Sequence, residues 1–155
     1  MTSPGSLPGM ADESTQSITV EADADTIMGV IADFAAYPEW TGAVKETEVL
    51  TEDGDGQATQ VRFVIDAGMF KDTYTLEYEW AEDGLSVNWH LVKGQMQRSQ
   101  RGRYLLEPQG DDATKVTYTL SVQLAVPMIG MFRRKAEKMI MDIALKDLKR
   151  RAEGL

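Results

Sequence analysis

Six segments of alternating apolar and polar residues, joined by short turns, restrict this chain to a largely antiparallel sheet. They lie between residues 43 and 126, and in one of them Val61, Phe63 and Ile65 occupy every second position. Successive side chains on a strand point to opposite faces, so each segment has one apolar and one more polar face. Turn sequences such as EDGDG at 52–56 separate the segments. The pattern predicts an antiparallel meander with one solvated face.

A further strand and two short helices are expected before the meander. Residues 17–21 alternate in the same way, and Asp23 follows as a helix N-cap. One amphipathic helical stripe follows this cap: Ile27, Val30, Ile31 and Phe34. Pro38 disfavours a helical conformation at the residue before it, so this helix should end or kink there, with a second helical turn over 35–40.

The last segment, residues 127–151, predicts a long helix that covers the apolar face of the sheet. At about 100° per residue, one arc of this helix should face the sheet. This arc contains Met128, Ile129, Phe132, Ala136, Met139, Ile140 and Ile143. A second apolar sector contains Met141, Ala144, Leu145 and Leu148. That sector either packs against the helix around residues 25–34 or forms a dimer or partner surface.

The order of these elements resembles a known family. The most specific stretch is residues 22–50, ADADTIMGVIADFAAYPEWTGAVKETEVL, in which a capped helix, a Y-P-E-W knuckle and a G-x-V-K strand follow one another. In this respect the chain resembles the START-like (SRPBCC) superfamily, and especially its bacterial polyketide cyclase/dehydrase and coenzyme-Q-binding branch. The resemblance runs from about Gln16 to the C-terminus and implies the helix-grip fold.

The expected fold class is therefore α+β. It has a curved antiparallel sheet of six to seven strands, two short helices after the first strand, and a long C-terminal helix across the sheet. Residues 1–14 are rich in Gly, Pro and Ser and are expected to be a disordered leader or an expression remnant. Residues 15–155 are expected to form a single START-like domain.

Composition argues against several classes of function. The chain has no cysteine and one histidine, so neither thiol catalysis nor a transition-metal site is expected, and no cofactor is predicted. The net charge of −9 disfavours nucleic acid as a partner. No apolar run approaches the ~18 residues of a membrane span. We expect a cytoplasmic protein without integral membrane contact, either a monomer or a homodimer formed through the C-terminal helix.

Basic residues concentrate near the C-terminus. Residues 133–151 carry eight basic and three acidic side chains, whereas residues 1–56 carry twelve acidic side chains and one basic one. The basic cluster is either a solvated helix face or a docking face for an acidic partner or a lipid surface.

A set of mostly aromatic and apolar side chains is predicted to bind a hydrophobic ligand. The set is Phe34, Trp40, Phe63, Tyr74, Tyr78, Trp89, Tyr118, Met128, Phe132, Ala136, Met139 and Ile143. A buried tyrosine hydroxyl needs a hydrogen-bond partner. The partner here could be a ligand carbonyl or quinone oxygen, a neighbouring strand, or an ordered water.

The remaining polar candidates are expected outside this site. His90 alternates with Trp89 and Leu91, which places it on the solvated face. Arg101 and Arg103 share one face of their strand, and we expect them to lie outside and pair with Glu77 and Glu79. In related aromatase/cyclases an inward arginine is thought to orient the polyketide, which is the alternative placement. No catalytic residue is predicted.

The preferred functional hypothesis is binding or carrying of a hydrophobic small molecule, such as a lipid, an isoprenoid quinone or a polyketide-like compound. An enzyme is the less favoured alternative. It would be a polyketide aromatase/cyclase or dehydrase in which a tyrosine or a carboxylate assists proton transfer. A further alternative is a protein-interaction protein, suggested by the second apolar sector and the basic face of the last helix. The resemblance adds the possibility of a ribosome-associated regulator.

Overall fold

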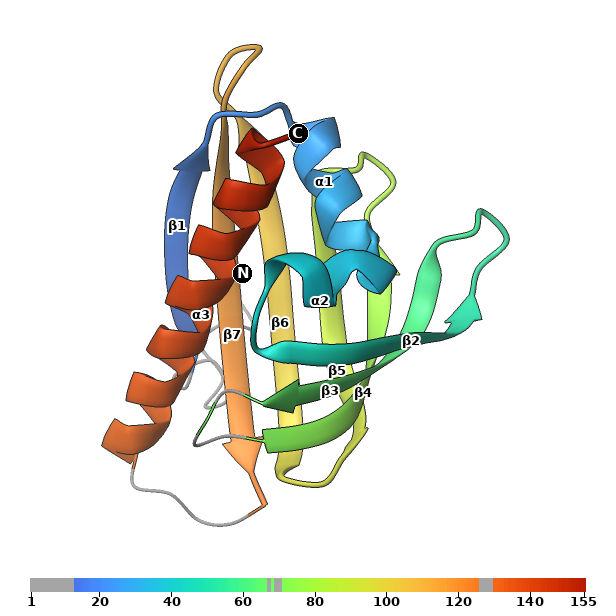
Figure 1. The fold of residues 1–155 in the computed structure, drawn as a ribbon, viewed down its shortest axis with the longest axis vertical. Helices are drawn as coiled ribbons and strands as arrows, with labels where there is room; N and C mark the ends of the chain where they lie inside the picture. Colours follow the sequence, from blue (N-terminus) through green and yellow to red (C-terminus); the bar gives the residue numbers. More distant parts are fainter. Residues whose placement is uncertain (1–12, 67, 69–70, 126–129) are drawn as a thin grey trace, which may run out of the picture.

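A computed structural model describes residues 13–66, 68, 71–125 and 130–155, with side chains given outside 130–133. One seven-stranded antiparallel sheet has the order β1-β7-β6-β5-β4-β3-β2 (Figure 1). The strands are β1 (Ser14–Val20), β2 (Val44–Glu52), β3 (Ala58–Asp66), β4 (Lys71–Trp80), β5 (Ser86–Gly94), β6 (Gln97–Pro108) and β7 (Thr114–Leu124). The predicted fold class is confirmed. β1 begins earlier than expected, and residues 1–12 of the predicted leader lie outside the described residues.

The sheet is strongly curved. In Figure 1, β7 runs along the long axis of the molecule, whereas β2 and β3 run across it in front of the other strands. Register shifts between β2 and β3, such as the one between Val49 and Thr51, accompany this curvature. The sheet therefore has a concave face, and the helices lie on this side.

Two short helical segments lead from β1 into β2. Helix α1 (Ala24–Ala32) begins as predicted, because the carboxylate of Asp23 accepts a hydrogen bond from the Thr26 amide at 2.7 Å. The 3-10 turn η3 (Phe34–Ala36) and helix α2 (Tyr37–Trp40) confirm the predicted second helical turn. The hydroxyl of Thr47 on β2 donates to the carbonyl oxygen of Phe34 at 2.7 Å, which fixes η3 against the sheet.

Helix α3 (Gly130–Glu153) packs against β1, β7, α1 and α2, but with a different face from the one predicted. Met139 is 51% exposed and Ile143 is 41% exposed, so the prediction that these two side chains face the sheet is wrong. Ala136 is half-buried. Met128 and Ile129 lie outside the described residues, as does the side chain of Phe132.

The face of α3 that packs on the sheet contains a carboxylate. Its buried residues are Glu137, Met141, Leu145, Leu148 and Ala152. The carboxylate of Glu137 accepts hydrogen bonds from the Ser14 hydroxyl and the Val122 amide, both at 2.9 Å. These bonds compensate for the loss of hydration, so a charged residue lies where an apolar one is expected.

The second apolar sector of α3 is therefore part of the core. Met141, Leu145 and Leu148 are buried within the chain, and α3 packs against α1. This confirms the intramolecular alternative and excludes these three side chains as a dimer surface. No helix in the described part of the chain is long and apolar enough to span a membrane.

Candidate ligand-binding site on the concave face

Aromatic rings from six elements form one continuous cluster on the concave face of the sheet. Phe34 of η3 lies at its centre, with ring centroids 6.0 Å from Phe63 on β3 and 4.9 Å from Tyr78 on β4. Tyr78 continues to Trp89 on β5 at 5.7 Å. The cluster then reaches Tyr104 on β6 and Tyr118 on β7. Phe34, Trp89 and most of the other rings are buried, so the cluster is part of the core of the fold.

The alternation of side chains between the two faces of each strand, together with the strand register, explains why these rings meet. Antiparallel register places Phe63 opposite Tyr74, Tyr78 opposite Trp89, and Tyr104 opposite Tyr118. The structure thus brings together six of the residues predicted from the sequence, and their role in ligand binding stays a prediction. These six are Phe34, Phe63, Tyr74, Tyr78, Trp89 and Tyr118. Trp40 joins at the edge, with its ring 5.0 Å from that of Tyr37.

A glycine makes room for the central indole. Gly102 lies opposite Trp89, and a Cβ atom at Gly102 would fall 2.2 Å from the Trp89 ring. This separation is far below van der Waals contact, so the indole lies directly on the glycine backbone.

The tyrosine hydroxyls in this cluster differ in their hydrogen bonding. The Tyr37 hydroxyl donates to the carbonyl oxygen of Ile31. The hydroxyls of the other four tyrosines make no hydrogen bond to any residue that the structure describes: Tyr74, Tyr78, Tyr104 and Tyr118. Among the described side chains, the only fully enclosed polar atom without a partner is Trp40 Nε1, so these four hydroxyls are not fully enclosed.

The electrostatic environment keeps these phenols neutral. Burial raises the pKa of Tyr74, Tyr78 and Tyr104 well above the usual value of 10, and the neighbouring Tyr118 raises each of them further. Burial also raises the pKa of Tyr118, with a second contribution from the carboxylate of Glu137. At neutral pH the cluster therefore presents neutral hydroxyl groups that can donate hydrogen bonds.

We expect none of the tyrosines of the folded protein to ionise near pH 10. All five have a raised pKa in the fold. Their contribution to stability is fully present below the unfolded pKa of 10 and is lost as the pH rises above it. Tyrosinate absorbance near 295 nm should therefore rise together with the loss of far-UV circular dichroism. A reversible rise at pH 10 in the folded protein would contradict this.

A buried polar chain borders the aromatic cluster. Trp89 Nε1 donates to Gln100 Oε1 at 3.0 Å, and Gln100 Nε2 donates to Gln97 Oε1 at 2.6 Å. Gln97 Nε2 then donates to Asp72 Oδ2 at 3.0 Å. Asp72 Oδ1 accepts from the amides of residues 95 and 96, which fixes the β5–β6 hairpin to β4.

Sequence reasoning left this chain and Tyr104 out of the site, although a signal was present. Arg101 and Arg103 are exposed, as expected, so the intervening positions of β6 must face inward. These positions carry Gln100, Gly102 and Tyr104, and Trp89 contacts all three.

The outer face of the sheet holds the remaining polar candidates. His90 is exposed, as predicted, and its Nε2 lies 3.9 Å from Glu77 Oε2. The predicted pairing of Arg101 with Glu77 is wrong, because β5 lies between β6 and β4 and Arg101 faces His90 instead. Arg103 is separated from Glu79 by Asn88 in the same way. Among the described residues, no group of three or more His, Cys, Asp or Glu side chains could hold a metal ion.

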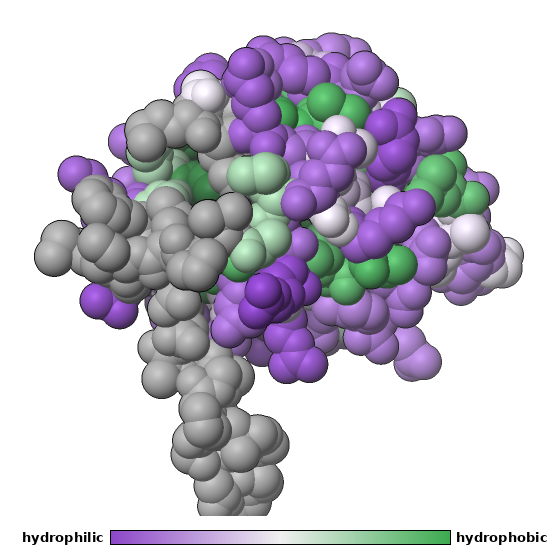
Figure 2. All heavy atoms as spheres, turned by 90° about the horizontal axis from the view of Figure 1, so that it is seen from below, coloured by the Kyte–Doolittle hydropathy of each residue, from purple (hydrophilic) through white to green (hydrophobic). Residues whose placement is uncertain are grey.

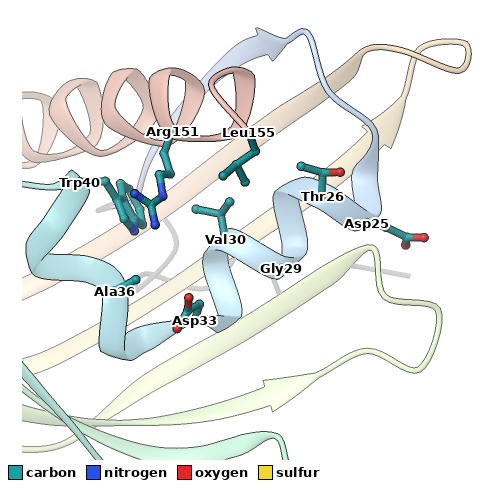
Figure 3. A pocket seen from close by; sticks show the side chains of 9 residues that line it. All are labelled: Asp25, Thr26, Gly29, Val30, Asp33, Ala36, Trp40, Arg151 and Leu155. Carbon is teal, nitrogen blue, oxygen red and sulfur yellow. The ribbon is translucent and has the colours of Figure 1, made fainter.

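A separate pocket of about 250 Å³ lies outside the concave face, between α1, α2 and the end of α3 (Figure 3). In Figure 3 the side chain of Arg151 lies beside the Trp40 ring, and Val30 and Leu155 point toward each other. The exposed side of α1 contributes Thr26 and Gly29.

Solved structures share this architecture. A START superfamily protein from Mycobacterium smegmatis superposes with a TM-score of 0.87 and 24% identity, covering 92% of this chain and 97% of that one. The protein TTHA0849 from Thermus thermophilus superposes with a TM-score of 0.75 and 23% identity, covering 90% of this chain and 96% of that one. The Zhui aromatase/cyclase from Streptomyces sp. R1128 superposes with a TM-score of 0.76 and 16% identity, covering 91% of this chain and 93% of that one. At these identities the similarity establishes the fold.

Sequence comparison is consistent with the structural similarity. Curated protein sequences give no match. The family model described as polyketide cyclase/dehydrase and lipid transport matches residues 11–153, which is nearly the whole chain. With its START-like fold, the chain therefore belongs to the polyketide cyclase/dehydrase and lipid transport family.

Proposed function

We propose that this protein binds and carries a hydrophobic small molecule on the concave face of its sheet, and that the molecule has at least one oxygen acceptor. The observation that supports this most directly is that one cluster of aromatic rings contains four tyrosine hydroxyls that make no hydrogen bond to a described residue. A lipid, an isoprenoid quinone and a polyketide-like compound all combine an apolar body with carbonyl or hydroxyl oxygens.

The chemistry of the cluster favours a ligand with a neutral hydrogen-bond acceptor over a cationic ligand or an ionised acid. Neutral phenols donate O–H to a carbonyl oxygen, and their raised pKa keeps the proton in place at neutral pH. Among the described residues, the buried charged side chains are Asp72 and Glu137, so no buried lysine or arginine would offset the charge of an anionic ligand. A ligand oxygen that accepts a hydrogen bond from one of these hydroxyls stabilises the complex.

A second candidate function is a polyketide aromatase/cyclase. The observation that favours it is the neutral phenol of Tyr118 within the aromatic cluster, whose pKa is raised by burial and, to a smaller extent, by the carboxylate of Glu137. A neutral phenol can donate a proton to an oxygen of a bound poly-β-keto chain. Conversion of a linear poly-β-keto thioester analogue to an aromatic product, lost in Tyr118→Phe, would support this function over simple binding.

Removal of single hydroxyls should weaken binding of a quinone probe. We expect Tyr78→Phe and Tyr118→Phe each to raise the Kd for a hydrophobic 1,4-naphthoquinone by roughly 2- to 10-fold, because each loses one neutral hydrogen bond. Quenching of tryptophan fluorescence measures this, since Trp89 lies within the cluster.

Tyr37→Phe is the matched control. Its hydroxyl already donates to the Ile31 carbonyl, so its loss should lower stability without changing the Kd. Native mass spectrometry after incubation with lipid extract tests the function itself. A protein that keeps its unliganded mass in that experiment, and whose fluorescence the quinone does not quench, would refute the proposal.

A further inference from the structure

The two ends of the sheet differ sharply in charge. In a meander, alternate turns lie at opposite ends. The β2–β3, β4–β5 and β6–β7 turns share one end, drawn toward the top and right of Figure 1. These turns, at 53–57, 81–85 and 109–113, contain no lysine or arginine. Their exposed charged residues are all acidic: Asp53, Asp55, Glu82, Asp83, Asp111 and Asp112.

The opposite end is basic. It carries the β5–β6 hairpin, the ends of β3 and β7 and the beginning of α3, toward the bottom of Figure 1. The exposed basic residues of this end are Lys71, Lys93, Arg98, Arg134 and Lys135. Asp66 lies 3.7 Å from Lys71, and the nearby Asp72 is buried and hydrogen-bonded to the hairpin. The exposed charge here is therefore net positive on a protein whose total charge is −9.

Apolar side chains project from the same basic hairpin. Val92 is 46% exposed and Met96 is 42% exposed, and they alternate with Lys93 and Arg98 along the hairpin. Figure 2, which views the molecule from below, shows hydrophobic patches between hydrophilic side chains on this face. Asp72 Oδ1 accepts hydrogen bonds from the amides of Gln95 and Met96, so the hairpin backbone is held in place while its apolar side chains remain outside.

We propose that the β5–β6 hairpin end docks reversibly on an anionic lipid surface. Val92 and Met96 enter the headgroup region, while Lys71, Lys93 and Arg98 contact lipid phosphates. A lipid surface suits a small convex tip with basic flanks, because such a surface requires no shape complementarity. The acidic turns lie at the far end, together with the end of α3, where Lys149, Arg150 and Arg151 are each paired with a carboxylate. The charge asymmetry of the molecule therefore directs the hairpin toward a negative surface.

Docking in this orientation would bring the concave site close to the lipid. Gly94 of the hairpin pairs with Tyr74, whose ring stacks on Phe63 in the aromatic cluster. The docking proposal and the ligand-binding proposal can be refuted independently, because vesicle binding can be measured without a ligand in the concave site.

The test is flotation of the full chain with vesicles of phosphatidylcholine containing 30% phosphatidylglycerol, in 50 mM and 500 mM NaCl. We expect binding at low salt, loss at high salt because surface charges are screened, and no binding to pure phosphatidylcholine. Lys93→Glu/Arg98→Glu should weaken binding at least about tenfold. Val92→Ser/Met96→Ser should weaken it at unchanged charge.

The matched control is Arg103→Glu/Lys115→Glu, which changes the net charge equally at two exposed positions away from the hairpin. Binding by this control should change less than threefold, and far-UV circular dichroism confirms that each variant is folded. Equal losses in both charge variants would overturn the proposal, as would the absence of binding to anionic vesicles. Retention on immobilised polyglutamate without vesicle binding would point to an acidic protein partner and also overturn it.

Discussion

Phe34→Ala should lower the free energy of unfolding by about 3–5 kcal/mol. Phe34 is 1% exposed, and its ring contacts four other aromatic rings. These rings come from α2, β3 and β4. Removing the ring leaves a cavity where the short helices meet the sheet, and ring contacts between rigid strands leave little freedom for collapse.

Urea denaturation followed by circular dichroism measures this loss. Phe34→Leu keeps most of the volume and should cost clearly less than the alanine variant. Leu155→Ala is the surface control, because Leu155 is 74% exposed and its truncation should change stability by less than about 0.5 kcal/mol. A loss below 1 kcal/mol for Phe34→Ala would show that η3 is not anchored as the structure indicates.

Gly102→Ala should lower the free energy of unfolding by about 1–3 kcal/mol. The added Cβ would lie 2.2 Å from the Trp89 ring, which is buried and cannot move aside without disturbing its neighbours. Displacement of the indole would also break the hydrogen bond from Trp89 Nε1 to Gln100 Oε1. Near-UV circular dichroism should therefore change together with the urea midpoint.

Two comparisons isolate the steric cause. Gly29→Ala adds a Cβ to α1 where nothing lies within 4 Å, so it should stabilise the protein by about 0.5–1 kcal/mol through helix propensity. In a Trp89→Leu background, Gly102→Ala should cost much less than in the natural chain. If Gly102→Ala lowered the free energy of unfolding equally in the natural chain and in the Trp89→Leu variant, a close contact between position 102 and the Trp89 ring would be contradicted.

Much of the concave site could be predicted because the face of the sheet to which a strand residue points depends only on its position in the local alternation. The alternation of Phe63, Tyr74, Tyr78, Trp89 and Tyr118 with polar neighbours was sufficient to place these rings on one face. Tyr104 and Gln100 follow the same parity once Arg101 and Arg103 are placed outside. Gln100 was overlooked because a buried polar side chain requires hydrogen-bond partners, and one of its partners, Trp89, lies on the neighbouring strand β5.

The rotation of α3 could not be predicted from periodicity. The helix has apolar residues on two sides, so hydrophobicity alone did not distinguish the face with Met139 and Ile143 from the face with Met141 and Leu145. The choice depends on Glu137, whose carboxylate bonds to Ser14 and Val122. Only the folded chain brings these residues together.

The sequence by itself thus determined the order of the elements, the antiparallel sheet and its apolar face, because these depend on side-chain period and turn chemistry. The tertiary structure decided which face of α3 is buried and which tyrosine hydroxyls have no partner among the described residues. Each of these depends on contacts between residues far apart in the chain, and local patterns carry no information about such contacts.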